Sequence, residues 1–168
     1  MPKIIENLKD RLLSEAQQQM EEGGYESVTI RSIAKGCGVG VGTVYNYFPS
    51  KDALIATLLL ADWRVCVDAI QLAADRSEAA EPVLRCVYRQ LVDFAHRHES
   101  IFRSDAAASG FAGSFSQYHD LLRRQLAAPM EKFCVSDFEA RFVAESLLTW
   151  SMAGIPFDEI YEILKKLF

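Results

Sequence analysis

Apolar residues recur every three or four positions along almost the whole chain, which is the pattern of amphipathic α-helices. Sustained alternation of apolar and polar residues is absent, and so are the Asn-Gly and Asp-Gly pairs that mark tight hairpins. The sequence therefore predicts an all-α protein.

The N-terminal third of the chain predicts three short helices. The first carries its apolar stripe from Ile5 to Met20 and stops at Gly23-Gly24, because glycine suits the left-handed end of a helix. The second begins at Ser27 or Thr29 and ends in the glycines at 36 and 38. The third covers about residues 43–47, before Pro49. Ser50 then caps a long helix with Asp52 in its first turn.

The rest of the chain predicts longer helices. Pro82 fits a first helical turn, a further helix covers 111–126, and Ser136 with Glu139 forms a capping box that opens another, ending at Gly154. The last helix starts at Pro156, and its stripe is too apolar to face water: Phe157, Ile160, Tyr161, Leu164 and Leu167. We expect this stripe to meet a second copy, so that helices 136–153 and 156–168 of two chains form a four-helix dimer interface.

Composition narrows the class of protein. The chain has 168 residues, half of them apolar, which is enough for a buried core. The N-terminus has no secretory signal and the longest apolar stretch is too short to span a membrane, so we expect a cytoplasmic protein without membrane partners. The four cysteines lack CxxC spacing, so we expect no metal site and no cofactor.

Charge points to one stretch of the chain. The net charge is -5, which alone argues against a nucleic-acid partner. Residues 27–51, however, carry Arg31, Lys35 and Lys51 and no acidic residue. This is the window in which the two short helices flank Gly36-Cys37-Gly38-Val39-Gly40, a turn typical of a helix-turn-helix. We therefore predict a helix-turn-helix DNA-binding head over 1–50 and a helical ligand-binding and dimerisation body over 51–168.

The same window resembles the tetracycline-repressor (TetR/AcrR) family of bacterial regulators. The similarity rests on Thr29-Ile30-Arg31-Ser32-Ile33-Ala34, on Gly38-Val39, and on Gly42-Thr43-Val44-Tyr45-Asn46-Tyr47-Phe48 followed by Ser50-Lys51-Asp52-Ala53-Leu54. The chain departs from the family at Cys37, where alanine is usual, and at Gly40, where serine is usual. Gly40 can start a helix but lacks the side-chain cap.

The resemblance implies binding to double-stranded DNA as a homodimer. Tyr45, Tyr47 and Lys51 are expected to contact phosphates, while Phe48 is expected in the core. The full set of expected DNA-binding residues is Thr29, Arg31, Val41, Gly42, Thr43, Tyr45, Asn46, Tyr47 and Lys51.

Aromatic residues of the body are candidates for a ligand pocket because together they exceed what a small bundle needs, although any single one of them is more often a core residue. The candidate ligand-binding residues are Trp63, Cys66, Phe94, Phe102, Phe115, Tyr118 and Trp150. The sequence thus favours a repressor released from a palindromic operator by a small apolar or amphipathic ligand. The alternative is a DNA-binding regulator without such a ligand, controlled by a protein partner or by thiol oxidation. An enzyme is not expected, because no nucleophile elbow, HExxH, phosphate-binding loop or paired carboxylates occur.

Overall fold

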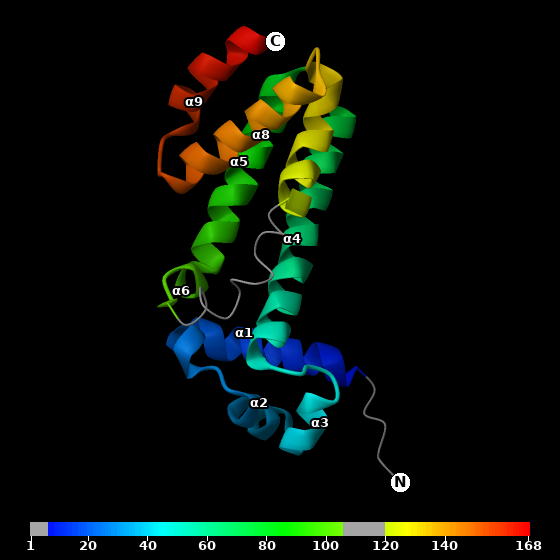
Figure 1. Cartoon of the computed structure of the whole chain (residues 1–168), viewed down its shortest axis with the longest axis vertical. Helices are drawn as coiled ribbons and strands as arrows, with labels where there is room; N and C mark the ends of the chain where they lie inside the picture. Colours follow the sequence, from blue (N-terminus) through cyan, green and yellow to red (C-terminus); the bar gives the residue numbers. More distant parts are fainter. Residues whose placement is uncertain (1–6, 106–119) are drawn as a thin grey trace. The chain divides into compact units, whose positions relative to one another are not determined.

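The computed structural model describes residues 7–105 and 120–168 (Figure 1). No strand occurs among these residues, and the predicted all-α class is confirmed. Residues 120–127 are helical, and 3₁₀ turns cover Ala128–Phe133 and Lys165–Leu167. The other helices are α1 (Leu8–Ser27), α2 (Ile30–Cys37), α3 (Val41–Tyr45), α4 (Lys51–Arg76), α5 (Ala80–Arg97), α6 (Glu99–Phe102), α8 (Asp137–Met152) and α9 (Phe157–Leu164).

The chain divides into two compact units. The first, which we call the head, contains the residues up to Ala61 and the segment that begins at Glu99 with α6. The second, the body, contains Asp62–His98 and the helices that follow residue 119. The predicted domain boundary at residue 50 is the start of α4, whose first turns belong to the head and whose remainder belongs to the body.

The head is built around a small apolar core to which every one of its helices contributes. Leu12 of α1, Ile33 of α2 and Val44 of α3 are fully buried, and Ile101 of α6 joins the same core. Phe48 is buried there too, as the sequence predicts. Helix α2 packs against both α1 and α3, so the core fixes the pair α2 and α3 on the longer α1.

Local signals in the sequence explain where the helices of the head begin and end. Helix α1 is interrupted at Gly24, which has φ 73° and ψ 177°, and one further turn then continues to Ser27. Thr29 caps α2 in a reciprocal capping box with Ser32. Ser50 caps α4 by accepting a hydrogen bond from the backbone N–H of Ala53 at 3.0 Å. The predicted helix starts are thus confirmed at both caps.

The body is held together by the packing of α5 against α8, with α9 packed on both of them. Leu84 and Val87 of α5 and Val143 and Leu147 of α8 are fully buried in this core. Ser136 caps α8, but the carboxylate of Glu139 accepts from the N–H of Val135 and not from that of the cap residue. The predicted capping box is therefore only half formed.

The apolar stripe of α9 lies inside its own chain. Phe157, Ile160 and Leu164 are buried in the body core, and the ring of Phe157 stacks on that of Tyr161 with centroids 5.5 Å apart. The expectation that this stripe faces a second copy is therefore wrong. Helix α9 folds back on α5 and α8, where its apolar side is removed from water without a partner chain.

Candidate nucleic-acid interface

The turn between α2 and α3 is fixed by its own backbone. Gly38 ends α2 with φ 67°, a conformation that costs other residues about 1 kcal/mol or more. The N–H of Val39 donates to the carbonyl of Ala34 at 2.9 Å, and the N–H of Thr43 donates to that of Gly40 at 2.9 Å. Gly40 starts α3 without a side-chain cap, as the sequence indicates. The result is a two-helix unit with a short, defined turn.

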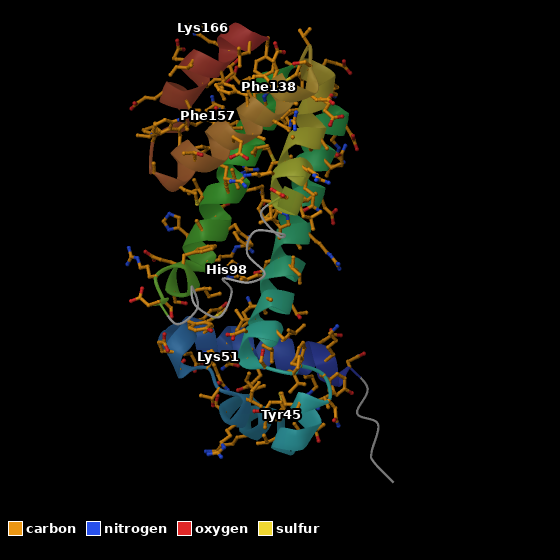
Figure 2. The ribbon with its side chains drawn as sticks, viewed as in Figure 1. Tyr45, Lys51, His98, Phe138, Phe157 and Lys166 are labelled. Carbon is orange, nitrogen blue, oxygen red and sulfur yellow. The ribbon has the colours of Figure 1, made fainter. Side chains whose placement is uncertain are left out.

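Helix α3 buries one side chain and exposes most of the others. Val44 anchors it in the head core, whereas Tyr45 is 52% exposed and Tyr47 is 44% exposed. Val41, Gly42 and Asn46 are exposed as well, and Thr43 is half-buried. Figure 2 shows Tyr45 on this helix. Phenol, amide and hydroxyl groups gathered on an exposed helix can donate hydrogen bonds to phosphates and base edges.

Helix α2 contributes positive charge. Arg31 and Lys35 are both exposed, and their spacing of four residues places them on one side of the helix. Lys35 is absent from the sequence-predicted site, although the acid-free window contains it. Thr29, one of the predicted DNA-binding residues, also caps the helix, since its hydroxyl accepts the N–H of Ser32 at 3.0 Å.

Lys51 is bound within the head. Its Nζ donates to the backbone carbonyl of Tyr25 at 2.6 Å and lies 3.7 Å from the centroid of the Tyr25 ring. Burial lowers the pKa of Lys51, against the opposing effect of the carboxylates of Glu26 and Asp52. The hydroxyl of Tyr25 in turn donates to Asp52 at 2.7 Å, and burial together with this carboxylate raises the pKa of the phenol. Sequence reasoning missed Tyr25, whose only signal is an aromatic residue directly after two glycines.

Three of the predicted pocket residues meet in the body. Trp63 and Phe94 form an edge-to-face pair with centroids 5.5 Å apart, and Cys66 is fully buried beside them. The indole N–H of Trp63 donates to Gln125 at 2.8 Å. The guanidinium of Arg97 lies 3.7 Å from the Cys66 sulfur, yet burial raises the pKa of this thiol. Such a thiol is poorly reactive, which gives no support to redox sensing at Cys66.

Two other predicted pocket residues, Phe102 and Trp150, are not part of this buried group. Phe102 is exposed and belongs to the head, and Trp150 is exposed on α8. Phe115 and Tyr118 lie outside the described residues.

His98, at the C-terminal end of α5, is buried. The Nε2 atom of His98 (labelled in Figure 2) is 2.9 Å from Oδ2 of Asp62, while no described residue forms a hydrogen bond with its Nδ1 atom. Burial lowers the pKa of His98 more strongly than Asp62 raises it. The imidazole is therefore neutral near pH 7.

Two further observations concern the kinds of site the chain carries. Over residues 7–105 and 120–168, no three histidine, cysteine or acidic side chains gather as metal ligands would. Within the same part of the chain, no helix has the length and apolar character that a membrane crossing requires.

Two helices joined by a fixed glycine turn, with polar side chains exposed on the second, define a helix-turn-helix protein of the DNA-binding class. Residues 12–58 match the model of the bacterial regulatory proteins of the tetR family. This stretch of the head therefore belongs to the tetR family, and the resemblance inferred from the sequence is confirmed.

Known relatives agree with this assignment. The HTH-type transcriptional regulator UidR of Escherichia coli strain K12 is 37% identical over 54 residues, which are 32% of this chain and 28% of UidR. The match thus spans less than a third of that relative.

Two solved structures resemble nearly the whole chain. A TetR-family regulator from Streptomyces coelicolor has a TM-score of 0.66 at 13% identity, covering 95% of this chain and 99% of its own. FadR from Bacillus subtilis, in complex with stearoyl-CoA, has a TM-score of 0.56 at 16% identity, covering 92% and 96%. These identities show the fold alone. All three relatives are described as transcriptional regulators.

Proposed function

We propose that the chain is a homodimeric transcriptional repressor that binds a palindromic operator and is released from it by a small apolar or amphipathic ligand. The observation that carries the DNA-binding part is the exposed surface of α3 and of the two residues after it, with Tyr45, Asn46 and Tyr47, together with the exposed cations Arg31 and Lys35 of α2. A recognition helix enters the major groove while cations and hydroxyls around it bind phosphates.

The proposed dimer uses the outer face of α8. Phe138 is 69% exposed and Phe142 is 49% exposed, four residues apart, with ring centroids separated by 6.5 Å. Trp150 further along α8 and Ile163 of α9 are also exposed. Adjacent exposed aromatic rings are typical of a protein interface. The last two helices therefore remain the proposed interface, with α8 supplying the apolar side chains that the buried stripe of α9 cannot.

The proposed ligand site is centred on Trp63 and Phe94. Helix α4 runs without interruption from Lys51 to Arg76 and begins six residues after the end of α3. A ligand that displaces Trp63 would therefore act on the helix that directly follows the helix-turn-helix. The FadR relative, whose structure contains stearoyl-CoA, supports an amphipathic ligand as the class to test first. Any such ligand must bind less tightly to the DNA-bound protein than to the free protein, by the same factor by which it weakens DNA binding.

DNA binding is tested by selecting bound sequences from a random duplex library and measuring the affinity of the enriched duplex. We expect two inverted half-sites, because a two-fold dimer reads a palindrome. Arg31→Ala should weaken binding at least fivefold, while Arg89→Ala, an equal change of charge at an exposed body residue, should leave it unchanged. Enriched sequences without inverted symmetry, or equal effects of the two variants, would contradict the proposal.

Ligand control is tested with stearoyl-CoA and the selected duplex. The acyl-CoA should raise the melting temperature of the protein and lower its DNA affinity, because it binds the native state in the DNA-free form. Trp63→Phe should reduce both effects and keep operator affinity within a few fold. If stearoyl-CoA and a panel of shorter acyl and aromatic compounds change neither quantity, the regulator without a small-molecule ligand is the better account.

A further inference from the structure

The contact with Tyr25 uses only part of the hydrogen-bonding capacity of Lys51. An ammonium group has three N–H donors, and one of them goes to the Tyr25 carbonyl at 2.6 Å. The Lys51 side chain remains half-exposed, with Nζ held against the Tyr25 ring. No other described residue accepts a hydrogen bond from this ammonium, so it can still donate to another acceptor from a position that is already fixed.

Tyr25 can fix the position of Lys51 because Tyr25 itself is held at both ends. Its ring is buried and its hydroxyl donates to Asp52, the residue that follows Lys51. Its carbonyl also accepts the N–H of Val28 at 3.3 Å. The bond to Asp52 and the bond from Lys51 together join the end of α1 to the first turn of α4.

The short turn that carries Tyr25 is also held by α6 and the residues directly after it. The hydroxyl of Ser104 donates to the carboxylate of Glu26 at 2.6 Å, and Ile101 is buried in the head core. A Cβ atom on Gly24 would lie 3.7 Å from Cβ of Ser100, so α6 lies directly against the kink of α1. The backbone carbonyl that binds Lys51 is thus part of a well-supported turn.

A free lysine side chain loses rotamer entropy when it is ordered, so fixing it before DNA arrives favours binding. We propose that Tyr25, which the sequence did not implicate, is a positioning residue for DNA binding: it holds the Lys51 ammonium so that a remaining N–H group meets a backbone phosphate. This inference rests on the proposed DNA-binding function.

The test is the salt dependence of affinity for the selected duplex, measured with the full chain. Each phosphate contact contributes about 0.9 to the slope of log affinity against log salt. Lys51→Met, which keeps the aliphatic stem, should lower the slope by about one. Tyr25→Met, which removes the ring under the ammonium and the bond to Asp52, should weaken binding severalfold and lower the slope as well. The double variant should bind no more weakly than Lys51→Met, because the two residues act on one contact.

Several results would overturn the inference. A Tyr25→Met protein that is folded by circular dichroism but shows an unchanged slope and a loss additive with Lys51→Met would make Tyr25 merely structural. A tighter-binding Tyr25→Met would mean that Tyr25 withholds Lys51 from DNA. If the unmodified chain shows no specific DNA binding, the proposed function itself is refuted.

A second measurement needs no variant. In the unmodified protein, an amine-acetylating reagent should modify Lys51 more slowly once the duplex is bound, whereas Lys166 at the exposed C-terminal end should react at an unchanged rate. Equal protection of the two lysines, or none at Lys51, would contradict a phosphate contact at Lys51 and with it the role of Tyr25.

Discussion

The exposed rings on α8 lead to a quantitative prediction about assembly. A phenylalanine removes about 200 Å² from water when it is fully buried. At 49% exposure, Phe142 therefore has about 100 Å² left to bury, or about 2.5 kcal/mol at about 25 cal/mol per Å². An interface with two-fold symmetry presents this residue twice, which doubles the figure to about 5 kcal/mol.

Replacing Phe142 by glutamate removes this gain and adds two like charges to one interface. Phe142→Glu should therefore raise the dissociation constant of the dimer at least about a thousandfold. Because Phe142 is not part of the body core, the monomer should keep its helicity. The assay is sedimentation velocity over a range of concentrations, with circular dichroism as the check on folding.

Ile160→Glu is the matched control, since the same charge enters the stripe of α9. Ile160 is buried in its own chain, so this variant should lose stability and helical signal whatever its oligomeric state. A Phe142→Glu protein that remains dimeric at all concentrations, or an Ile160→Glu protein that is a well-folded monomer, would refute the assignment of the two faces.

Three further predictions concern the head and the buried histidine. Thr29→Ala should lower the free energy of unfolding by about 1 kcal/mol through loss of the α2 cap, while Thr29→Ser should preserve stability and operator affinity. If Thr29→Ser loses as much operator affinity as Thr29→Ala, the methyl group of Thr29 contacts the DNA. Gly40→Ser should stabilise the start of α3 by a few tenths of a kcal/mol, because the backbone there (φ -73°, ψ 147°) suits a capping serine; hydrogen exchange of α3 amides checks this, and unchanged protection counts against it. The pKa of His98 is lowered from its usual 6.5, so the unfolded state binds this proton more readily and the folded state should lose stability as the pH falls below about 6.5. Denaturant titrations should show this loss in the unmodified protein and less of it in His98→Gln; identical pH profiles would exclude His98 as its source.

Much of the head could be predicted because its signals are local. The left-handed turn at Gly38 favours glycine, and Thr29 and Ser50 cap the helices they precede. Val44 and Phe48 are apolar residues four positions apart, and both are buried in the core. Each signal involves residues within a few positions of one another. The matched stretch 12–58 contains all of them, which explains why the family could be inferred from the sequence.

The side-chain roles depended on residues that lie far apart along the chain. Lys51 binds a carbonyl 26 residues earlier, and Trp63 binds Gln125 62 residues later. The period of α9 shows that Phe157, Ile160 and Leu164 share one face, but it does not show which element that face meets. Burial against α5 and α8 settles this for α9, while Phe138 and Phe142 stay exposed on the other side of α8. The sequence by itself thus determined the helices, their caps and the helix-turn-helix. The tertiary structure alone decided which apolar face is core and which cation is held, because both depend on the sum of contacts between distant segments.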